Sequence, residues 1–346
     1  MTSCGRAGTR RGRSAEERLP LMGSVSSHPH AFGGIPQIMH TLEQQGYIAD
    51  REVALSIHLS VVLRKPLLIE GAAGVGKTEV AKVMARAIDA DLIRLQCYEG
   101  LDVHTALYEW NYQRQMLRIK LEETSGRPVE EKEHLIFSEP FMLKRPLLQA
   151  ITAERAPVLL IDEVDRADEE FEAFLLEVLS DFQVSIPEIG TIRARHIPYV
   201  VLTSNRTREL SDALRRRCLY LWIDYPSFEK ELSIIHRKVP EINDRLARQI
   251  GAFMQFVRRV PLDKIPGIAE TLDWSAALLA LHRDHLDPGA VEETLGCLCK
   301  DQEDLTRVRA QYLAPILQSV DALGQSGDGW NSARIDSLAS QLPKGR

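Results

Sequence analysis

The sequence lacks several features that would place it in a specialised class. A membrane-spanning helix needs about 20 consecutive apolar residues, and the longest apolar runs here are short ones such as Val158 to Ile161. The five cysteines are odd in number and show no CxxC spacing, which argues against a disulfide framework or a structural zinc site. The 49 acidic residues outweigh the 43 basic ones and leave a net charge of -6. We therefore expect a reduced, cytoplasmic protein with no membrane span that does not bind nucleic acid through its net charge.

What the sequence does contain indicates a globular protein. Its 346 residues are 44% apolar and 27% charged, which suits one large domain or a large and a small one. The first 20 residues combine arginines with Glu16 and Glu17 and have no apolar segment behind them, so a secretory signal is not expected. Met22 is a second plausible translation start. We expect residues 1–31 to form a disordered tail outside the fold.

Strand-like and helix-like segments alternate from about residue 32. Short apolar runs predict strands at residues 66–70, 92–97, 157–161, 199–203 and 220–223. Helical spacing predicts helices at residues 38–42, 53–61, 80–88, 101–121 and 169–179, with another ending near residue 153; a polar break spans residues 124–134, and a hairpin turn is expected at residues 187–190. This alternation predicts an α/β fold with a parallel sheet and flanking helices.

The character of the sequence changes near Tyr225. Only helical patterns follow, and one of these helices has Asp287 as a good N-cap and Pro288 at its first position. We expect an α/β nucleotide-binding domain at residues 32–225, with an insertion at about 101–141. A helical lid domain at 226–323 and a C-terminal tail at 324–346 would follow.

A glycine-rich segment after the first strand fits the phosphate-loop pattern GxxxxGK[ST]. Its residues are Gly71, Ala72, Ala73, Gly74, Val75, Gly76, Lys77 and Thr78, and Glu79 follows them. Backbone N–H groups must wrap a polyphosphate without a Cβ in the way, which explains the glycines. Lys77 would reach the β and γ phosphates, and the Thr78 hydroxyl would bind Mg²⁺. The alternative is a structural glycine turn.

Two carboxylates come directly after the strand at residues 157–161. At this edge of an open parallel sheet, where ligands bind, Asp162 would hold the metal and Glu163 would orient and polarise the attacking water. The alternative is that acidic residues cap the following helix, which Asp165 and Asp168 could do.

Two further polar features follow the later strands. Asn205 ends the strand at residues 199–203, where its amide could bind the γ phosphate and the water; a turn-forming asparagine is the alternative. Arg215, Arg216 and Arg217 end a short helix that begins near Leu210. Their positive charge could stabilise the C-terminus of that helix, contact nucleic acid, or reach a neighbouring subunit's nucleotide.

Together these motifs and the helical tail resemble the AAA+ ATPases, and more narrowly their MoxR group. The resemblance covers about residues 34–322. Three segments resemble the branch that includes the carbon monoxide dehydrogenase maturation ATPase: Cys97–Asp102, Ala106–Trp110 and Pro266–Trp274.

The resemblance implies a homo-oligomeric ring, usually a hexamer, that hydrolyses ATP with Mg²⁺ to remodel a protein client. Such a client is often a metalloenzyme, and a partner with a von Willebrand factor A domain is common. Carried onto this chain, the Walker A motif is Gly71–Thr78, Walker B is Asp162–Glu163, and sensor 1 is Asn205. Arg217 takes the arginine-finger position with Arg216 as second candidate. Tyr47 and Ile48 would pack against adenine.

This sequence departs from the family in one respect. The lid helix usually presents a sensor-2 arginine, but the stretch Leu272–Ala276 contains none. Either the lid senses the γ phosphate differently, or hydrolysis is slower or depends on a partner. The insertion at 101–141 and the hairpin at 182–197 would face the ring pore, although Tyr108, Trp110 and Met116 could equally be core residues.

The sequence thus predicts a magnesium-dependent remodelling ATPase. Two other classes remain open. A nucleic-acid-dependent AAA+ ATPase would share every ATP motif, and a nucleotide-gated scaffold would bind ATP with little turnover. Cys297 and Cys299 could bind a soft metal, but their spacing on a helix favours buried structural thiols.

Overall fold

The computed structural model describes residues 34–122, 128, 131, 135–325 and 330–343. The tail expected at residues 1–31 and most of the polar break expected at 124–134 lie outside the described residues. The described residues all belong to one unit, Phe32–Arg346. None of the helices within the described ranges is both long and apolar enough to cross a bilayer.

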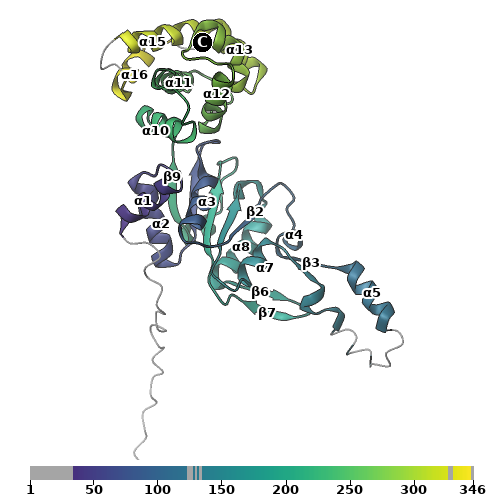
Figure 1. Ribbon diagram of the computed structural model, residues 1–346. Coiled ribbons are helices and arrows are strands. Elements are labelled where there is room, and N and C mark those ends of the chain that lie inside the picture. Colours follow the sequence, from purple (N-terminus) through teal and green to yellow (C-terminus); the bar gives the residue numbers. More distant parts are fainter. Residues whose placement is uncertain (1–33, 123–127, 129–130, 132–134, 326–329, 344–346) are drawn as a thin grey trace, which may run out of the picture. The chain divides into compact units, whose positions relative to one another are not determined.

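A five-stranded parallel sheet forms the centre of the α/β region (Figure 1). Its strands are β1 (Leu67–Gly71), β2 (Leu92–Gln96), β5 (Val158–Asp162), β8 (Tyr199–Ser204) and β9 (Leu219–Ile223). They lie in the order β2-β5-β8-β1-β9. All residues of β1 and β5 are buried, as expected for a parallel sheet covered on both faces.

Successive residues of these strands enter two different cores. Helices α1 (Ile35–Gln44), α2 (Arg51–Leu63) and α3 (Lys77–Ala87) pack with Leu67, Ile69 and Leu160 on one face. Helices α7 (Pro146–Ile151), α8 (Glu169–Asp181) and α9 (Asp212–Arg217) pack with Leu68, Leu159 and Ile161 on the other. The sheet therefore exposes mainly its edges and its carboxyl end.

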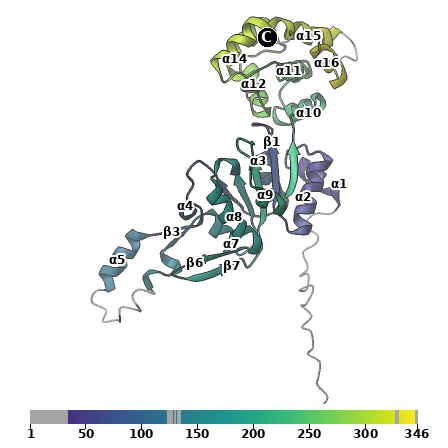
Figure 2. The same cartoon turned by 180° about the vertical axis from the view of Figure 1, so that it is seen from behind.

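Within the described residues only helices follow β9, as the sequence predicts, and Figure 2 shows them grouped together. They are α10 (Phe228–Lys238), α11 (Asp244–Val257), α12 (Ile268–Ala280), α13 (Pro288–Thr294), α14 (Gln302–Arg307), α15 (Leu313–Gln325) and α16 (Ser332–Ala339). Their shared core includes Phe253, Trp274 and Tyr312. The Asp287 carboxylate accepts a hydrogen bond from the backbone N–H of Ala290, so it is the expected N-cap.

The C-terminal segment differs from the expected tail. Residues 332–339 form α16, and its Ile335 is buried in the core of the helical region. The Ser332 hydroxyl donates to the Glu229 carboxylate of α10. The helix is short, and its single fully buried side chain explains why the apolar pattern alone did not reveal it.

The prediction of a single helix at residues 101–121 is wrong. The chain instead forms α4 (Val103–Leu107), β3 (Tyr108–Trp110) and α5 (Tyr112–Glu122), and β3 pairs antiparallel with β4 (Met142–Lys144). Tyr108 and Trp110 are buried on either side of exposed Glu109, a two-residue period that identifies a strand. Met116 on α5 is exposed. The expected hairpin is present as β6 (Gln183–Ile186) and β7 (Gly190–Arg193).

Candidate nucleotide and magnesium site

The phosphate loop joins the end of β1 to the start of α3, as its sequence pattern predicts. Gly76, at the N-cap of α3, has φ 96°. Residues other than glycine rarely adopt this backbone conformation. The first turn of α3 therefore begins directly after the loop. Its backbone N–H groups and helix dipole favour an anion at this position.

Lys77 lies inside this loop. Its ammonium group donates to the backbone carbonyls of Gly71, at 2.8 Å, and of Ala72, at 2.6 Å. Burial lowers the pKa of Lys77, and the carboxylates of Asp165, Asp162 and Glu163 act against this by favouring the charged form. The loop therefore holds one positive charge beside its backbone donors.

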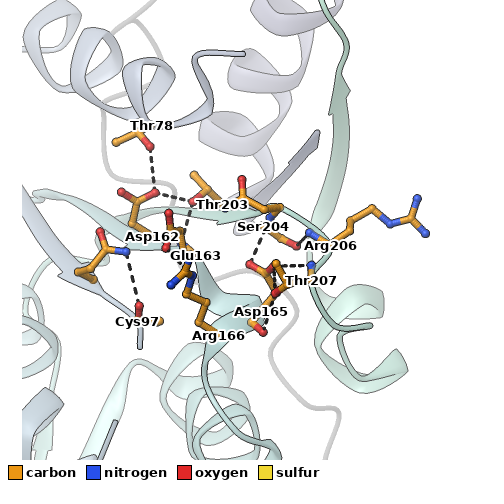
Figure 3. A network of polar contacts seen from close by, with 12 residues as sticks. Thr78, Cys97, Asp162, Glu163, Asp165, Arg166, Thr203, Ser204, Arg206 and Thr207 are labelled. Carbon is orange, nitrogen blue, oxygen red and sulfur yellow. Dashed lines mark hydrogen bonds and ion pairs between the residues drawn. The ribbon is translucent and has the colours of Figure 1, made fainter. Parts of the chain in front are cut away.

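Thr78 and Asp162, which are far apart in the sequence, meet at the carboxyl end of the sheet (Figure 3). The Thr78 hydroxyl donates to Asp162 Oδ1 at 3.0 Å. The same oxygen accepts from the Thr203 hydroxyl at 2.5 Å. Hydroxyl and carboxylate oxygens are the donors that Mg²⁺ prefers, usually with several waters and the phosphates of a substrate. The residues present therefore fit a magnesium ion bound with ATP.

Glu163 follows Asp162 in a left-handed backbone conformation with φ 54°. Its backbone N–H donates to the Thr203 hydroxyl at 2.9 Å. Its carboxylate pairs with Arg166 at 2.9 Å and is about one-third exposed. Non-glycine residues adopt this conformation rarely. Thr203 thus contacts both residues of the motif, Asp162 through its carboxylate and Glu163 through its backbone.

Asn205 lies just beyond the end of β8, where Asp165 orders the backbone. Asp165 accepts from the Asn205 N–H at 3.2 Å, the Thr207 N–H at 2.8 Å and the Thr207 hydroxyl at 2.7 Å. Asp168, not Asp165, caps α8, because it accepts from the Phe171 N–H at 2.8 Å. Asp165 therefore connects the segment after β5 to the segment that carries Asn205.

These groups surround one cavity of about 510 Å³, a volume typical of small-molecule sites. The predicted residues that line it are Tyr47, Ile48, Ala73, Gly74, Val75, Gly76, Lys77, Thr78, Glu79, Asp162, Glu163 and Asn205. Gly71, Ala72, Arg216 and Arg217 do not. Burial raises the pKa of Tyr47, and Asp50 and Glu79 raise it further. The Tyr47 phenol therefore stays neutral in the cavity wall.

The helical region completes the cavity with residues that the sequence patterns did not indicate. Ile268, Ala269 and Leu272 of α12 line it, and Lys230 and Lys238 of α10 add positive charge. The Lys230 ammonium pairs with Asp50 before α2. These lysines have no motif spacing relative to the phosphate loop, so only the packing of α10 brings them to the cavity.

The first turn of α12 also contacts the phosphate loop directly. The Ile268 N–H donates to the Gly74 carbonyl at 2.9 Å. A Cβ on Gly267 would lie 2.7 Å from Gly74 Cα, which is closer than real contacts allow. The helical region thus contacts the phosphate loop through backbone atoms. The stretch Leu272–Ala276, where the family usually has a sensor-2 arginine, contains no arginine.

Neither candidate arginine finger reaches this cavity. Arg217 donates to the Leu176 carbonyl of α8 at 3.0 Å. Arg216 is exposed and makes no side-chain hydrogen bond or ion pair with the described residues. Arg215 lies over the Tyr220 ring, 5.8 Å from its centroid. The arginine run therefore lies outside the site of its own chain.

Comparison with known proteins agrees with this geometry. Residues 66–218 match the family model described as AAA domain (dynein-related subfamily). The Holliday junction branch migration complex subunit RuvB of Thermotoga maritima is 26% identical over 196 residues, or 53% of this chain and 57% of that protein. An uncharacterized protein of Staphylococcus aureus is 24% identical over 204 residues, or 57% of this chain and 69% of that protein. The match thus spans little more than half of the RuvB chain.

Solved structures show a weaker likeness. That of Thermotoga maritima RuvB covers 88% of this chain and 89% of its own, with 18% identity and a TM-score of 0.42. A mutant of the same protein covers 90% and 92%, with 18% identity and a TM-score of 0.45. The family match, the sheet and the phosphate loop define the class: this is an AAA+ P-loop fold followed by a helical region. The part of the chain that matches the family model is residues 66–218, less than half of its length.

Proposed function

We propose that this protein hydrolyses ATP and uses the energy to remodel a protein client. The observation that carries this proposal is the contact between Thr78 and Asp162, 3.0 Å apart across 84 residues of sequence. It joins the phosphate loop to the paired carboxylates beside one cavity. A structural glycine turn or a simple helix cap would require no such convergence.

In this mechanism Lys77 and the loop N–H groups bind the β and γ phosphates. Thr78 and Asp162 would hold Mg²⁺, which supplies charge neutralisation on the phosphates when bound. Glu163 polarises the attacking water and Asn205 orients it. Tyr47 and Ile48 form the adenine wall. Arg217, or Arg216, completes the site of a neighbouring subunit.

The finer assignment follows the resemblance to the MoxR group. We infer a ring, usually of six subunits, that acts in the maturation of a metalloenzyme or another protein complex beside a von Willebrand factor A domain partner. What supports this assignment is the resemblance of the segments Cys97–Asp102, Ala106–Trp110 and Pro266–Trp274 to that group. We also infer a cytoplasmic location, because Cys97, Cys218, Cys297 and Cys299 are free thiols.

The substitution Glu163→Gln tests the catalytic assignment. It keeps the shape of the side chain but removes the carboxylate, so we expect ATP to bind as in the parent while turnover falls about 100-fold or more. Labelled-ATP binding and phosphate release measure the two effects. Glu169→Gln, an exposed change on α8, is the matched control and should turn over normally. Parental turnover by the Glu163→Gln protein would show that Glu163 is not the base.

The RuvB relatives favour a second candidate, an AAA+ ATPase that depends on nucleic acid. Those relatives are subunits of a Holliday junction branch migration complex. The net charge of -6 argues against it. Turnover measured with and without branched DNA separates the two: strong, salt-sensitive stimulation by DNA would favour the second candidate. A scaffold with little turnover would show slow hydrolysis in every condition, including with a client.

A further inference from the structure

We propose that Arg94 is a positioning residue for the magnesium site. Its guanidinium holds one oxygen of the Asp162 carboxylate, so that the other oxygen stays directed at Thr78. The role depends on the proposed function, because it concerns the metal that accompanies ATP. Nothing in the phosphate-loop or carboxylate motifs indicates this residue.

The two oxygens of Asp162 have separate partners. Arg94 donates to Oδ2 from Nε at 3.0 Å and from Nη2 at 2.6 Å. Among the described residues, the partners of Oδ1 are two hydroxyls, which donate from Thr78 at 3.0 Å and from Thr203 at 2.5 Å. The carboxylate is therefore fixed in rotation, with Oδ1 beside the hydroxyl that would bind Mg²⁺. Its side chain is 3% exposed, so no bulk water replaces these partners.

The parallel pairing of β2 with β5 makes this contact possible. Gln96 lies opposite Asp162 in the register, and Arg94 lies opposite Leu160. Arg94 and Gln96 therefore share one side of β2, an edge strand. The Gln96 side-chain oxygen accepts from Arg94 Nη2 and keeps the guanidinium near the carboxyl end. The Arg94 side chain is 49% exposed, so its replacement opens no core cavity.

The chemistry of metal sites gives this contact a function. Carboxylates that bind metals are themselves held by hydrogen bonds, and loss of such a partner typically lowers metal affinity about 10–100-fold. An arginine stays protonated at any working pH and can place two donors on one carboxylate. The opposite effect would arise if the guanidinium mainly repelled the cation. Removing Arg94 would then tighten Mg²⁺ binding.

The test uses the full chain with Arg94→Gln and Arg94→Lys substitutions. The affinity for fluorescently labelled ATP is measured in EDTA and at increasing Mg²⁺. For Arg94→Gln we expect unchanged affinity in EDTA and a half-saturating Mg²⁺ concentration about 10–100-fold above that of the parent. For Arg94→Lys the half-saturating Mg²⁺ concentration should lie between those of the parent and of Arg94→Gln, because a lysine keeps the charge but not the paired donors. Thermal unfolding in EDTA confirms that each variant is folded.

Arg155→Gln is the matched control. It also removes one positive charge from a surface ion pair, with Asp89, and Arg155 precedes β5. It should titrate with Mg²⁺ as the parent does. Unchanged or tighter Mg²⁺ dependence in a folded Arg94 variant overturns this inference and leaves the proposed function intact. A parent that binds no labelled ATP overturns the proposed function and this inference with it.

Discussion

At the scale of single residues, Asp165 shows how a carboxylate can order a site without touching a ligand. It is 2% exposed, and its oxygens accept from the Asn205 and Thr207 backbone N–H groups and from the Thr207 hydroxyl. Burial by itself would raise the pKa of Asp165, but these hydrogen bonds outweigh burial and lower it. The ionised form is therefore the one that the folded protein favours.

The substitution Asp165→Asn should destabilise the protein in a pH-dependent way. An amide presents one acceptor oxygen, so one of the donors loses its partner, at a cost of about 1–3 kcal/mol in unfolding free energy at neutral pH. Because the folded pKa lies below the unfolded value of about 3.9, this stabilisation is complete above that value and is lost as the pH falls through the folded pKa. Urea unfolding at pH about 7 and about 3.5 measures the difference in unfolding free energy between parent and variant. This difference should be smaller at the lower pH.

Asp168→Asn provides the control for this prediction. Asp168 caps α8 through its contact with the Phe171 N–H, and asparagine caps helices about as well as aspartate. Its substitution should change stability little. If Asp165→Asn lost no more stability than Asp168→Asn, or lost the same amount at both pH values, the ordering role of Asp165 would be wrong.

The contrast between these two aspartates shows what sequence can and cannot say about a residue. Both follow the Asp162–Glu163 pair, and both have the spacing of helix caps. Local spacing named both as possible caps and was right only for Asp168, which bonds the N–H of a residue three positions away. It was wrong for Asp165, because the partners of Asp165 lie about 40 residues further along the chain.

At the scale of elements, the turn before α12 is the main link between the helical region and the phosphate loop. Arg258 supports this turn from behind, because its Nε donates to the Pro266 carbonyl at 2.9 Å. The same guanidinium forms a buried two-bond ion pair with Glu231, at 2.7 Å for each contact. Removing either partner would leave a buried charge unpaired. The turn is thus held in place on both sides.

The substitution Gly267→Ala should weaken nucleotide binding. The new Cβ would meet backbone atoms of Gly74 at 2.7 Å and 2.8 Å, and backbone cannot move aside as a flexible side chain can. We expect an affinity for labelled ATP about 10-fold lower, equivalent to about 1.4 kcal/mol, with the fold retained. Equilibrium titration of each variant measures this loss.

Gly296→Ala is the control for this change. A Cβ at Gly296 would meet no atom within 4 Å, so this alanine should bind ATP as the parent does. An unchanged affinity for Gly267→Ala would mean that the contact between α12 and the phosphate loop does not support nucleotide binding.

At the scale of the whole molecule, the arginine run requires a second copy of the chain if it acts in catalysis. Arg217 is held by the Leu176 carbonyl, and neither Arg216 nor Arg217 lines the cavity. Arg216 is exposed and makes no side-chain hydrogen bond or ion pair with the described residues. The assignment of both residues as candidate arginine fingers comes from the resemblance to AAA+ rings, in which one subunit completes the site of the next.

Mixing two inactive variants tests this arrangement. A Glu163→Gln subunit lacks the base but keeps its arginines, and an Arg216→Ala, Arg217→Ala subunit has the reverse defect. In a mixed ring some sites combine an intact Glu163 with an intact neighbouring arginine, so turnover should recover. Phosphate release is measured against the mixing ratio, with light scattering to confirm assembly. An arginine finger typically contributes about 10³–10⁵ in rate, so even partial recovery is visible.

The control mixture combines Glu163→Gln with Lys77→Ala. Both changes damage the site of their own subunit, and no arrangement of subunits restores a complete site. This mixture should stay inactive at every ratio. If the arginine mixture also stayed inactive while both variants assembled, the arginines would not act on a neighbouring subunit.

The sequence by itself determined the α/β class and the phosphate-loop pattern, and it predicted the paired carboxylates and Asn205, because each depends on a local pattern of strand, turn and polar residue. The tertiary structure alone decided three other features. They are the hold of Arg94 on Asp162, the role of Thr203 between Asp162 and Glu163, and the contact of Gly267 with Gly74. The physical reason is that each joins residues far apart in the chain. The distances between these residues depend on strand register and helix packing, which cannot be predicted from the local spacing of residues in the sequence.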